Sequence, residues 1–96
     1  MSDNLGEFAR ELAKSYGGFA KKVSDTPKNV TKYVIWEEKK PHNYIVGIIG
    51  ELEENGKKNI IFNLSPGYDL KKSDSVIEKY KPKLGNINQS KDLLFD

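Results

Sequence analysis

The sequence has no cysteine, a single histidine, a single arginine and no long hydrophobic run. The lack of cysteine excludes disulfides, thiolate metal sites and cysteine nucleophiles. The first residues do not combine a basic segment with an apolar one, and no stretch approaches the roughly eighteen apolar residues of a membrane span. We therefore expect a cytoplasmic protein without a membrane partner.

The charge of the chain is nearly balanced, because sixteen basic residues face fourteen acidic ones and leave a net charge of +2. This excess is too small to imply a nucleic-acid partner by itself. Arg10 is the only arginine, whereas guanine recognition favours the planar guanidinium group, so sequence-specific reading of a duplex is not expected. At 96 residues, the chain is long enough for one domain with a modest core.

The N-terminal region has the pattern of an amphipathic helix. Asn4 followed by Glu7 resembles a capping box, which places the start of the helix. Gly17-Gly18 would normally stop it, but apolar residues continue at helical spacing, so we expect the helix to end between Tyr16 and Val23. The apolar positions are Leu5, Phe8, Ala9, Leu12, Ala13 and Tyr16, continued by Phe19, Ala20 and Val23.

Three segments rich in β-branched and aromatic residues follow, and they predict an antiparallel meander. Asn55-Gly56 is a strong hairpin signal because both residues tolerate the positive φ of a type I′ turn. With this pair at the tip, Glu54 faces Lys57 and Ile49 faces Phe62. The three segments span residues 32–38, 44–53 and 58–64.

This register divides the apolar residues of the last two strands between two sides of the sheet. We expect one side to pack under the helix; it carries Ile45, Ile49, Ile60, Phe62 and Leu64. The other side is too apolar for full exposure to water, so a second helix, the C-terminal tail or a partner must cover it. It carries Tyr44, Val46, Ile48, Leu52 and Ile61.

A short second helix is predicted near the C-terminus, because Ser75 and Glu78 resemble a capping box and Pro82 should halt the helix. The chain is therefore expected to be one small α+β domain over residues 1–84. From Gly85 onward the sequence is polar, which predicts a flexible C-terminal tail over residues 85–96 with an apolar tip.

Enzymatic chemistry is not expected. His42 is the sole histidine, and no phosphate-binding glycine loop, serine elbow or zinc-binding pair accompanies it. Glu51 and Glu53 share a strand face and are the one arrangement suited to a magnesium ion, but charges near a hairpin tip more often keep a strand end soluble. We predict no cofactor, no metal and no catalytic residue.

Lysine doublets near strand ends suggest a nucleic-acid interface, since clustered ammonium groups attract phosphates and nearby rings can stack on bases. The alternative is that the rings belong to the core and the lysines form a solvated shell. The candidate residues are Lys39, Lys40, His42, Lys57, Lys58, Lys71 and Lys72, with Tyr33 and Trp36 as the aromatic partners, and Lys21-Lys22 forms a further doublet.

The predicted order of helix, three strands and helix resembles the double-stranded-RNA-binding domain. Leu12-Ala13, Lys40-Pro41-His42 and Gly56-Lys57 match that family's landmarks in the first helix and two loops. That family also opens its second helix with a basic stretch followed by alanines, whereas here Lys71-Lys72 precedes residues 73–75, which are Ser-Asp-Ser. The resemblance implies RNA contacts by Pro41, His42 and the basic pair, and it is a reason to test RNA.

The C-terminal tip carries a separate signal. Leu93, Leu94 and Phe95 lie between Asp92 and Asp96, and this pattern resembles the short peptides that dock into apolar pockets of replication clamps. Those peptides have a glutamine three residues before the first leucine, a position that serine holds here. The alternative is that the tip folds back and covers the second side of the sheet.

Two functional hypotheses remain after these exclusions. The first is a nucleic-acid-associated accessory protein, binding DNA or RNA through lysines and aromatic rings, with the tail recruiting a protein partner. The second is a small protein-binding regulator or inhibitor that uses the apolar sheet side or an edge strand. A homodimer that closes the apolar side is a variant of the second hypothesis.

Overall fold

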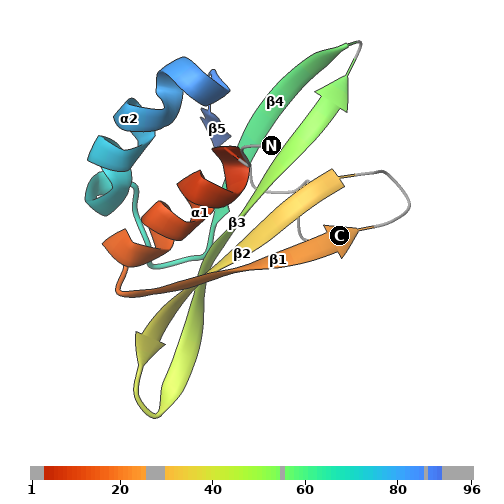
Figure 1. The fold of residues 1–96 in the computed structure, drawn as a ribbon. Coiled ribbons are helices and arrows are strands. Elements are labelled where there is room, and N and C mark those ends of the chain that lie inside the picture. The colour runs from red at the N-terminus through yellow and green to blue at the C-terminus, as the bar shows by residue number, and fades with distance from the viewer. Residues whose placement is uncertain (1–3, 26–29, 55, 86, 90–96) are drawn as a thin grey trace.

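A computed structural model describes residues 4–25, 30–54, 56–85 and 87–89 of the chain. Two helices lie on one side of a five-stranded sheet (Figure 1). The predicted α+β class is confirmed, with five strands in place of three. In chain order the elements are α1 (Asn4–Ser15), β1 (Gly18–Asp25), β2 (Val30–Lys39), β3 (His42–Glu54), β4 (Lys57–Leu64), the 3₁₀ helix η1 (Lys71–Ser73), α2 (Asp74–Leu84) and β5 (Ile87–Gln89).

The first helix ends earlier than its apolar stripe suggests. Gly17 adopts a φ of 74°, and its N–H bonds to the carbonyl of Lys14 at 3.1 Å, so the chain leaves the helix here. The following residues form β1, and the prediction that Phe19, Ala20 and Val23 continue the helical stripe is wrong. In a strand, Phe19 and Val23 point to one face and Ala20 to the other.

Strands β1 to β4 form an antiparallel meander in chain order. The predicted register of the last hairpin is confirmed, since Glu54 pairs with Lys57 and Ile49 with Phe62. The sheet is completed by β5, which pairs in parallel with β4. This strand lies within the segment predicted as a flexible tail, whose residues 90–96 are outside the described part of the chain.

A β-bulge in β3 changes which residues reach the core. Ile35 pairs with Gly47 and Trp36 pairs with Ile45, which leaves Val46 as an extra residue on β3. Val46 is buried on the helix side, and Ile45 is exposed on the opposite side. Ile45 and Val46 therefore lie on the sides opposite to those predicted. The prediction assumed that side chains alternate between the two faces along all of β3, and the bulge interrupts this alternation.

The second helix passes through Pro82 and ends at Leu84. The expectation that Pro82 halts it is wrong because this residue lies in the exposed last turn, where the loss of one backbone N–H leaves only a carbonyl that can bond water. Gly85 then ends the helix with a φ of 78°, and its N–H donates to the carbonyl of Lys81 at 2.8 Å.

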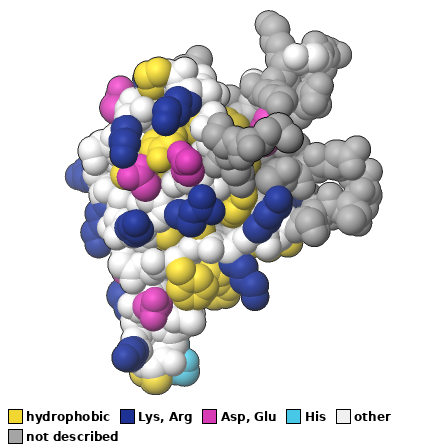
Figure 2. Space-filling model, in the orientation of Figure 1, with side chains coloured by type: hydrophobic (Ala, Val, Ile, Leu, Met, Phe, Trp, Pro, Cys, Tyr) yellow, Lys and Arg dark blue, Asp and Glu magenta, His cyan; other side chains and the backbone are white. Residues whose placement is uncertain are grey.

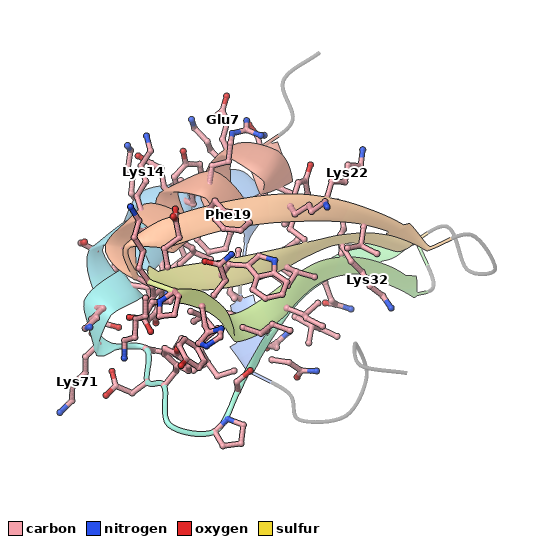
Figure 3. The ribbon with its side chains drawn as sticks, turned by 90° about the horizontal axis from the view of Figure 1, so that it is seen from below. Glu7, Lys14, Phe19, Lys22, Lys32 and Lys71 are labelled. Carbon is pink, nitrogen blue, oxygen red and sulfur yellow. The ribbon has the colours of Figure 1, made fainter. Side chains whose placement is uncertain are left out.

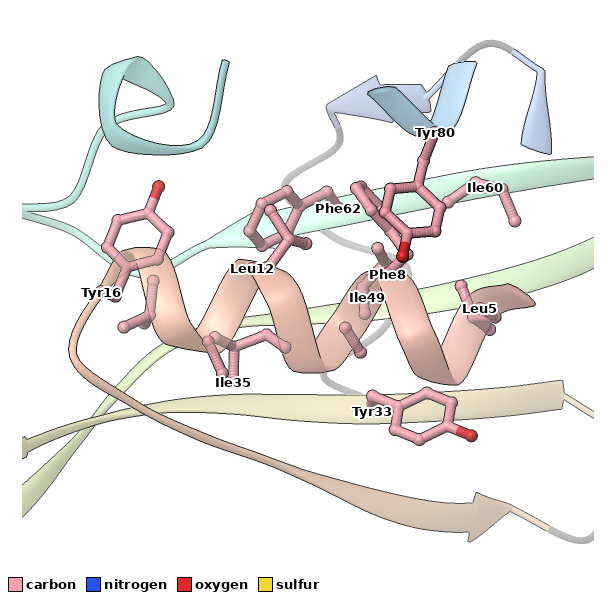
Figure 4. Packing of buried hydrophobic residues seen from close by; sticks show 13 residues of the cluster. Leu5, Phe8, Leu12, Tyr16, Tyr33, Ile35, Ile49, Ile60, Phe62 and Tyr80 are labelled. Carbon is pink, nitrogen blue, oxygen red and sulfur yellow. The ribbon is translucent and has the colours of Figure 1, made fainter. Parts of the chain in front are cut away.

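The core lies between the two helices and the near face of the sheet. Phe8 and Leu12 of α1 point toward the sheet, with Phe62 of β4 and Tyr80 of α2 beside them (Figure 4). The rings of Phe8 and Tyr80 have centroids 5.3 Å apart, so this contact joins the helices. The buried apolar cluster contains Leu5, Phe8, Ala9, Leu12, Ala13, Tyr16, Tyr33, Ile35, Val46, Ile49, Ile60, Phe62 and Tyr80.

Tyr16 connects the end of α1 to the chain that precedes α2. Its hydroxyl donates to the backbone carbonyl of Asp69 at 2.6 Å and lies 3.2 Å from the hydroxyl of Ser73. Its ring packs edge-on against Tyr68. These contacts hold both helices on the same side of the sheet.

We expect Leu12→Ala to lower the free energy of unfolding by about 2–5 kcal/mol, because Leu12 is fully buried and its removal leaves a cavity between α1 and the sheet. The exposed Lys14 of the same helix supplies the control, and Lys14→Ala should change stability by less than about 0.5 kcal/mol. Urea titrations followed by circular dichroism measure both values. Equal losses in the two variants would contradict this packing.

Candidate functional site

The sheet has one face that neither helix covers, and we call it the open face. The apolar residues that contact α1 and α2 all belong to the opposite face, so the predicted cover by a second helix does not occur. Of the five residues predicted on the second side, Ile48 and Ile61 do lie on the open face. Tyr44 and Val46 lie on the helix side instead. The side chain of Leu52 is outside the described residues. The open face carries Phe19, Lys21, Val23, Lys32, Val34, Trp36, Ile45, Ile48, Ile61 and Asn63.

The part of the open face nearest β1 is apolar and accessible. Phe19 and Trp36 pair across β1 and β2 with ring centroids 6.0 Å apart and an angle of 16° between the rings. Ile45 pairs with Trp36 from β3 and is 38% exposed. We call Phe19, Val23, Trp36 and Ile45 the exposed half of the open face.

Basic side chains accompany this apolar surface. Figure 2 shows hydrophobic side chains grouped over the start of β1 with lysine or arginine side chains beside them. Lys21 is exposed and shares the open face with Phe19 and Val23. The exposed half therefore combines aromatic and aliphatic surface with positive charge at its border.

The part of the open face nearest β4 is inaccessible. Ile61 is 7% exposed and Asn63 is 1% exposed, and Lys32 of β2 is also buried. The carboxamide of Asn63 has no hydrogen-bond partner among the described residues. We call Lys32, Ile61 and Asn63 the buried half of the open face.

A polar cluster lies on the helix side at the end of β2. The hydroxyl of Tyr68 donates to Oε1 of Glu37 at 2.6 Å, and Nζ of Lys39 lies 3.6 Å from the same oxygen. The hydrogen bond from Tyr68, supported by the charges of Lys39 and Lys72, holds the pKa of Glu37 below its usual range. The same bond raises the pKa of Tyr68 to about 12, because ionised Tyr68 would face a carboxylate.

The residues predicted to bind nucleic acid do not form one surface. Lys39 and Lys72 both lie close enough to Glu37, on the helix side, to lower its pKa. Trp36 lies on the open face. Tyr33 belongs to the core under α1. Lys40, His42 and Lys71 are exposed, and the side chains of Lys57 and Lys58 are outside the described residues.

Other predicted site features can be placed only in part. The tip residues Leu93, Leu94 and Phe95 are outside the described residues, as is the side chain of Glu53. Within the described part of the chain, no three side chains of the His, Asp and Glu types gather as a metal site. In the same part, neither helix has the length and apolarity needed to cross a lipid bilayer.

The order of elements also differs from that of the double-stranded-RNA-binding domain. That resemblance requires a helix, three strands and a second helix. Here β1 follows the first helix directly and forms an edge of the sheet, so four strands precede α2. The topological support for the resemblance is therefore lost.

Comparisons of the chain with protein families, with curated proteins and with solved structures found no match.

The stacked pair on the open face was missed by the sequence analysis because Phe19 was assigned to a helix. Residues 19–23 are Phe-Ala-Lys-Lys-Val and do not alternate between apolar and polar with a period of two, so the hydrophobic pattern gives no signal for this strand.

Glu37 should make stability depend on pH in acid. Its pKa is lowered from 4.5 in the folded chain, so its stabilising effect is present above that value and is lost as the pH falls through the folded-state pKa. We expect the unfolding free energy of Glu37→Gln to change less between about pH 5 and about pH 3 than that of the unsubstituted protein.

Glu38→Gln is the matched control for this pH dependence, because Glu38 is the adjacent residue and is exposed. Its stability should follow the pH in the same way as the unsubstituted protein. Urea titrations at both pH values give the slopes. A Glu37→Gln slope as steep as the control would exclude the Tyr68 contact as a source of acid sensitivity.

Proposed function

We propose that this chain is a non-enzymatic cytoplasmic binding protein that docks the exposed half of its open face onto an apolar surface of a partner protein. The observation that carries the proposal is the position of Phe19, Val23 and Ile45, which are exposed together on a sheet whose two helices lie on the opposite side. Apolar patches of this kind mark interaction sites in soluble proteins.

The chemistry of the exposed half favours a protein over a polyanion as the partner. Val23 and Ile45 are aliphatic, and they gain free energy by burial against other apolar groups rather than by contact with phosphates. Full burial of such a side chain contributes about 1.5–3 kcal/mol. The surface lies on paired strands, so little conformational entropy is lost when it binds.

The partner surface should carry acidic groups at its border. Lys21 is exposed on the open face between Phe19 and Val23, and its ammonium group would lie against the rim of a docked partner. Since β1 is an edge strand, a partner segment can also pair with its free backbone groups and extend the sheet. Lys21 and Lys22 in the middle of this edge limit indiscriminate pairing.

We expect Ile45→Ser to weaken partner binding about tenfold or more, because it removes exposed aliphatic surface beside Trp36 in the exposed half. Tyr44→Ser is the matched control, since Tyr44 is the adjacent residue, is 47% exposed and lies on the helix side. The partner is first captured with the unsubstituted protein, purified, and then titrated by calorimetry with each variant. Binding should change little between about 50 and 200 mM salt.

Two results would overturn this proposal. One is equal binding by both serine variants, which would place the interface elsewhere. The other is a concentration-dependent dimer in size-exclusion chromatography that Ile45→Ser dissociates, because the exposed half would then be occupied by a second copy of the chain.

A nucleic-acid role is the second candidate, and the stacked pair favours it. Phe19 and Trp36 present aromatic surface on the same face as Lys21, and this combination of rings with an ammonium group can bind single-stranded bases and phosphates. The lysines near Glu37 on the helix side would not take part in such a site. This candidate retains the accessory-protein hypothesis with a different set of residues.

The second candidate predicts binding that depends strongly on salt. Labelled single-stranded and double-stranded DNA and RNA are titrated at about 50 and 200 mM salt, and anisotropy reports binding. Micromolar affinity that falls at the higher salt and is weakened by Trp36→Ala, but not by Tyr44→Ser, would support it. No binding at the lower salt would exclude it.

A further inference from the structure

Strand β1 is the longer edge of the sheet (Figure 1). Of the strands that the structure describes, it is the outermost on its side, and its eight residues pair with β2 alone. The opposite edge is formed by β5, which has three residues. A strand that pairs on one side presents a row of backbone N–H and C=O groups on its other side. β1 is therefore the edge better suited to the addition of a strand from another chain.

The register of β1 identifies which backbone groups are directed outward. The N–H of Glu38 donates to the carbonyl of Gly17 at 3.3 Å, which continues the β1–β2 pairing by one residue. In an antiparallel ladder, hydrogen-bonded pairs alternate with pairs whose N–H and C=O groups are directed away from each other. The odd-numbered residues of 19–23 therefore bond to β2, whereas Ala20 and Lys22 direct their backbone groups outward.

These outward groups are available to a partner. Within the described part of the chain, no backbone hydrogen bond outside the helices and strands involves Ala20 or Lys22. A segment that pairs with both residues gains about four main-chain hydrogen bonds, two for each pair. Such bonds provide the affinity when an extended peptide adds a strand to the edge of a sheet.

The side chains along this edge combine apolar groups with positive charge. On the open face, Lys21 lies between Phe19 and Val23, and all three are exposed. On the helix side, Lys22 is exposed and Ala20 is half-buried. Neither lysine forms an ion pair with another described residue. One ammonium group on each face of the edge is therefore available to a carboxylate from outside.

We infer that the partner binds through an extended acidic segment that adds to β1 as a further strand. This inference rests on the proposed function, since β1 carries Phe19 and Val23 of the docking surface. Opposite these two residues, the segment presents apolar side chains that extend the exposed half onto the new strand. Opposite Lys21 and Lys22, it presents two consecutive Asp or Glu residues, whose side chains lie on the two faces of the sheet.

A second copy of the chain fits this edge poorly. A copy that paired in antiparallel orientation over all of residues 19–23 would place the two Lys21 side chains directly opposite each other. Like charges at such positions destabilise a sheet. The edge therefore favours a partner with acidic side chains over another copy of itself.

A peptide probe tests the side-chain pattern. A labelled, end-blocked peptide with Val-Glu-Glu-Thr-Val at its centre places its residues opposite positions 23 to 19 of β1, and the same peptide with Lys-Lys in place of Glu-Glu is the control. Anisotropy titrations should give at least about tenfold tighter binding of the glutamate peptide.

Charge reversal locates this preference. Combined Lys21→Glu and Lys22→Glu substitutions should make the chain prefer the lysine peptide. Combined Lys40→Glu and Lys71→Glu substitutions make the same change of net charge at exposed positions outside β1, and they should retain the preference for the glutamate peptide.

Proline separates backbone pairing from contact by side chains. Lys22→Pro removes an outward N–H, which an edge strand tolerates, whereas Lys22→Ala keeps it. We expect Lys22→Pro to bind the glutamate peptide about tenfold more weakly than Lys22→Ala. Circular dichroism confirms that both variants are folded.

Hydrogen exchange in the unsubstituted chain tests the same backbone groups without a substitution. In the free chain, the amides of Ala20 and Lys22 should exchange faster than that of Lys21, and the glutamate peptide should slow them about tenfold. Amides of Ala20 and Lys22 that are already protected in the free chain would overturn the inference. So would equal affinity for the two peptides, or no binding of the glutamate peptide at about 1 mM.

The added strand and the docking surface can fail separately. Weakened partner binding by Ile45→Ser, together with no binding of the glutamate peptide, would retain the docking surface and reject the added strand. Equal partner binding by Ile45→Ser and Tyr44→Ser, together with tight and selective binding of the glutamate peptide, would reject the docking surface and retain an edge that recognises acidic segments.

Discussion

The burial of α1 against the sheet is the interaction on which the rest of the structure depends. Phe8 and Leu12 are fully buried between the helix and the strands, and Tyr80 brings α2 to the same side. Because the hydrogen bonds of Tyr16 to Asp69 and Ser73 fix the chain before α2 on this side, the second helix cannot cover the opposite face. The arrangement that makes the core also leaves a large apolar sheet surface without a helix.

Local turn chemistry explains what could be predicted from the sequence. The Asn55-Gly56 signal predicts the β3–β4 register, because a two-residue turn pairs the residues that flank it, and Glu54 does pair with Lys57. The end of α1 was harder to place, since Phe19, Ala20 and Val23 fit both a helical stripe and a strand. The three residues of β5 are too few for a pattern, and the bulge at Val46 depends on the neighbouring strands rather than on local sequence.

The same physics explains why the candidate site was predicted only in part. Neighbouring residues of a strand point to opposite faces, so a lysine doublet on a strand is divided between two surfaces. Lys22 of β1 and Lys32 of β2 point to opposite sides of the sheet in Figure 3, although the two strands are adjacent. Tyr33 and Trp36 are separated in the same way, one in the core and one on the open face. Trp36 was predicted as a site residue from its side-chain type. Identifying its aromatic neighbour Phe19 required a correct assignment of β1.

The short connection between α1 and β1 has a consequence for how such a surface can change over time. Two residues, Tyr16 and Gly17, separate the helix from the paired strand, so the face that each β1 side chain occupies is set by the number of residues counted from the helix. Insertion of one residue at this point, with the strand kept in place, would turn Phe19, Lys21 and Val23 toward the helix side. Ala20 and Lys22 would then lie on the open face. A single codon gained or lost there would convert a hydrophobic edge into a polar one while the helix and the hairpins kept their sequences. Surfaces of this kind can acquire or lose a partner faster than their cores diverge.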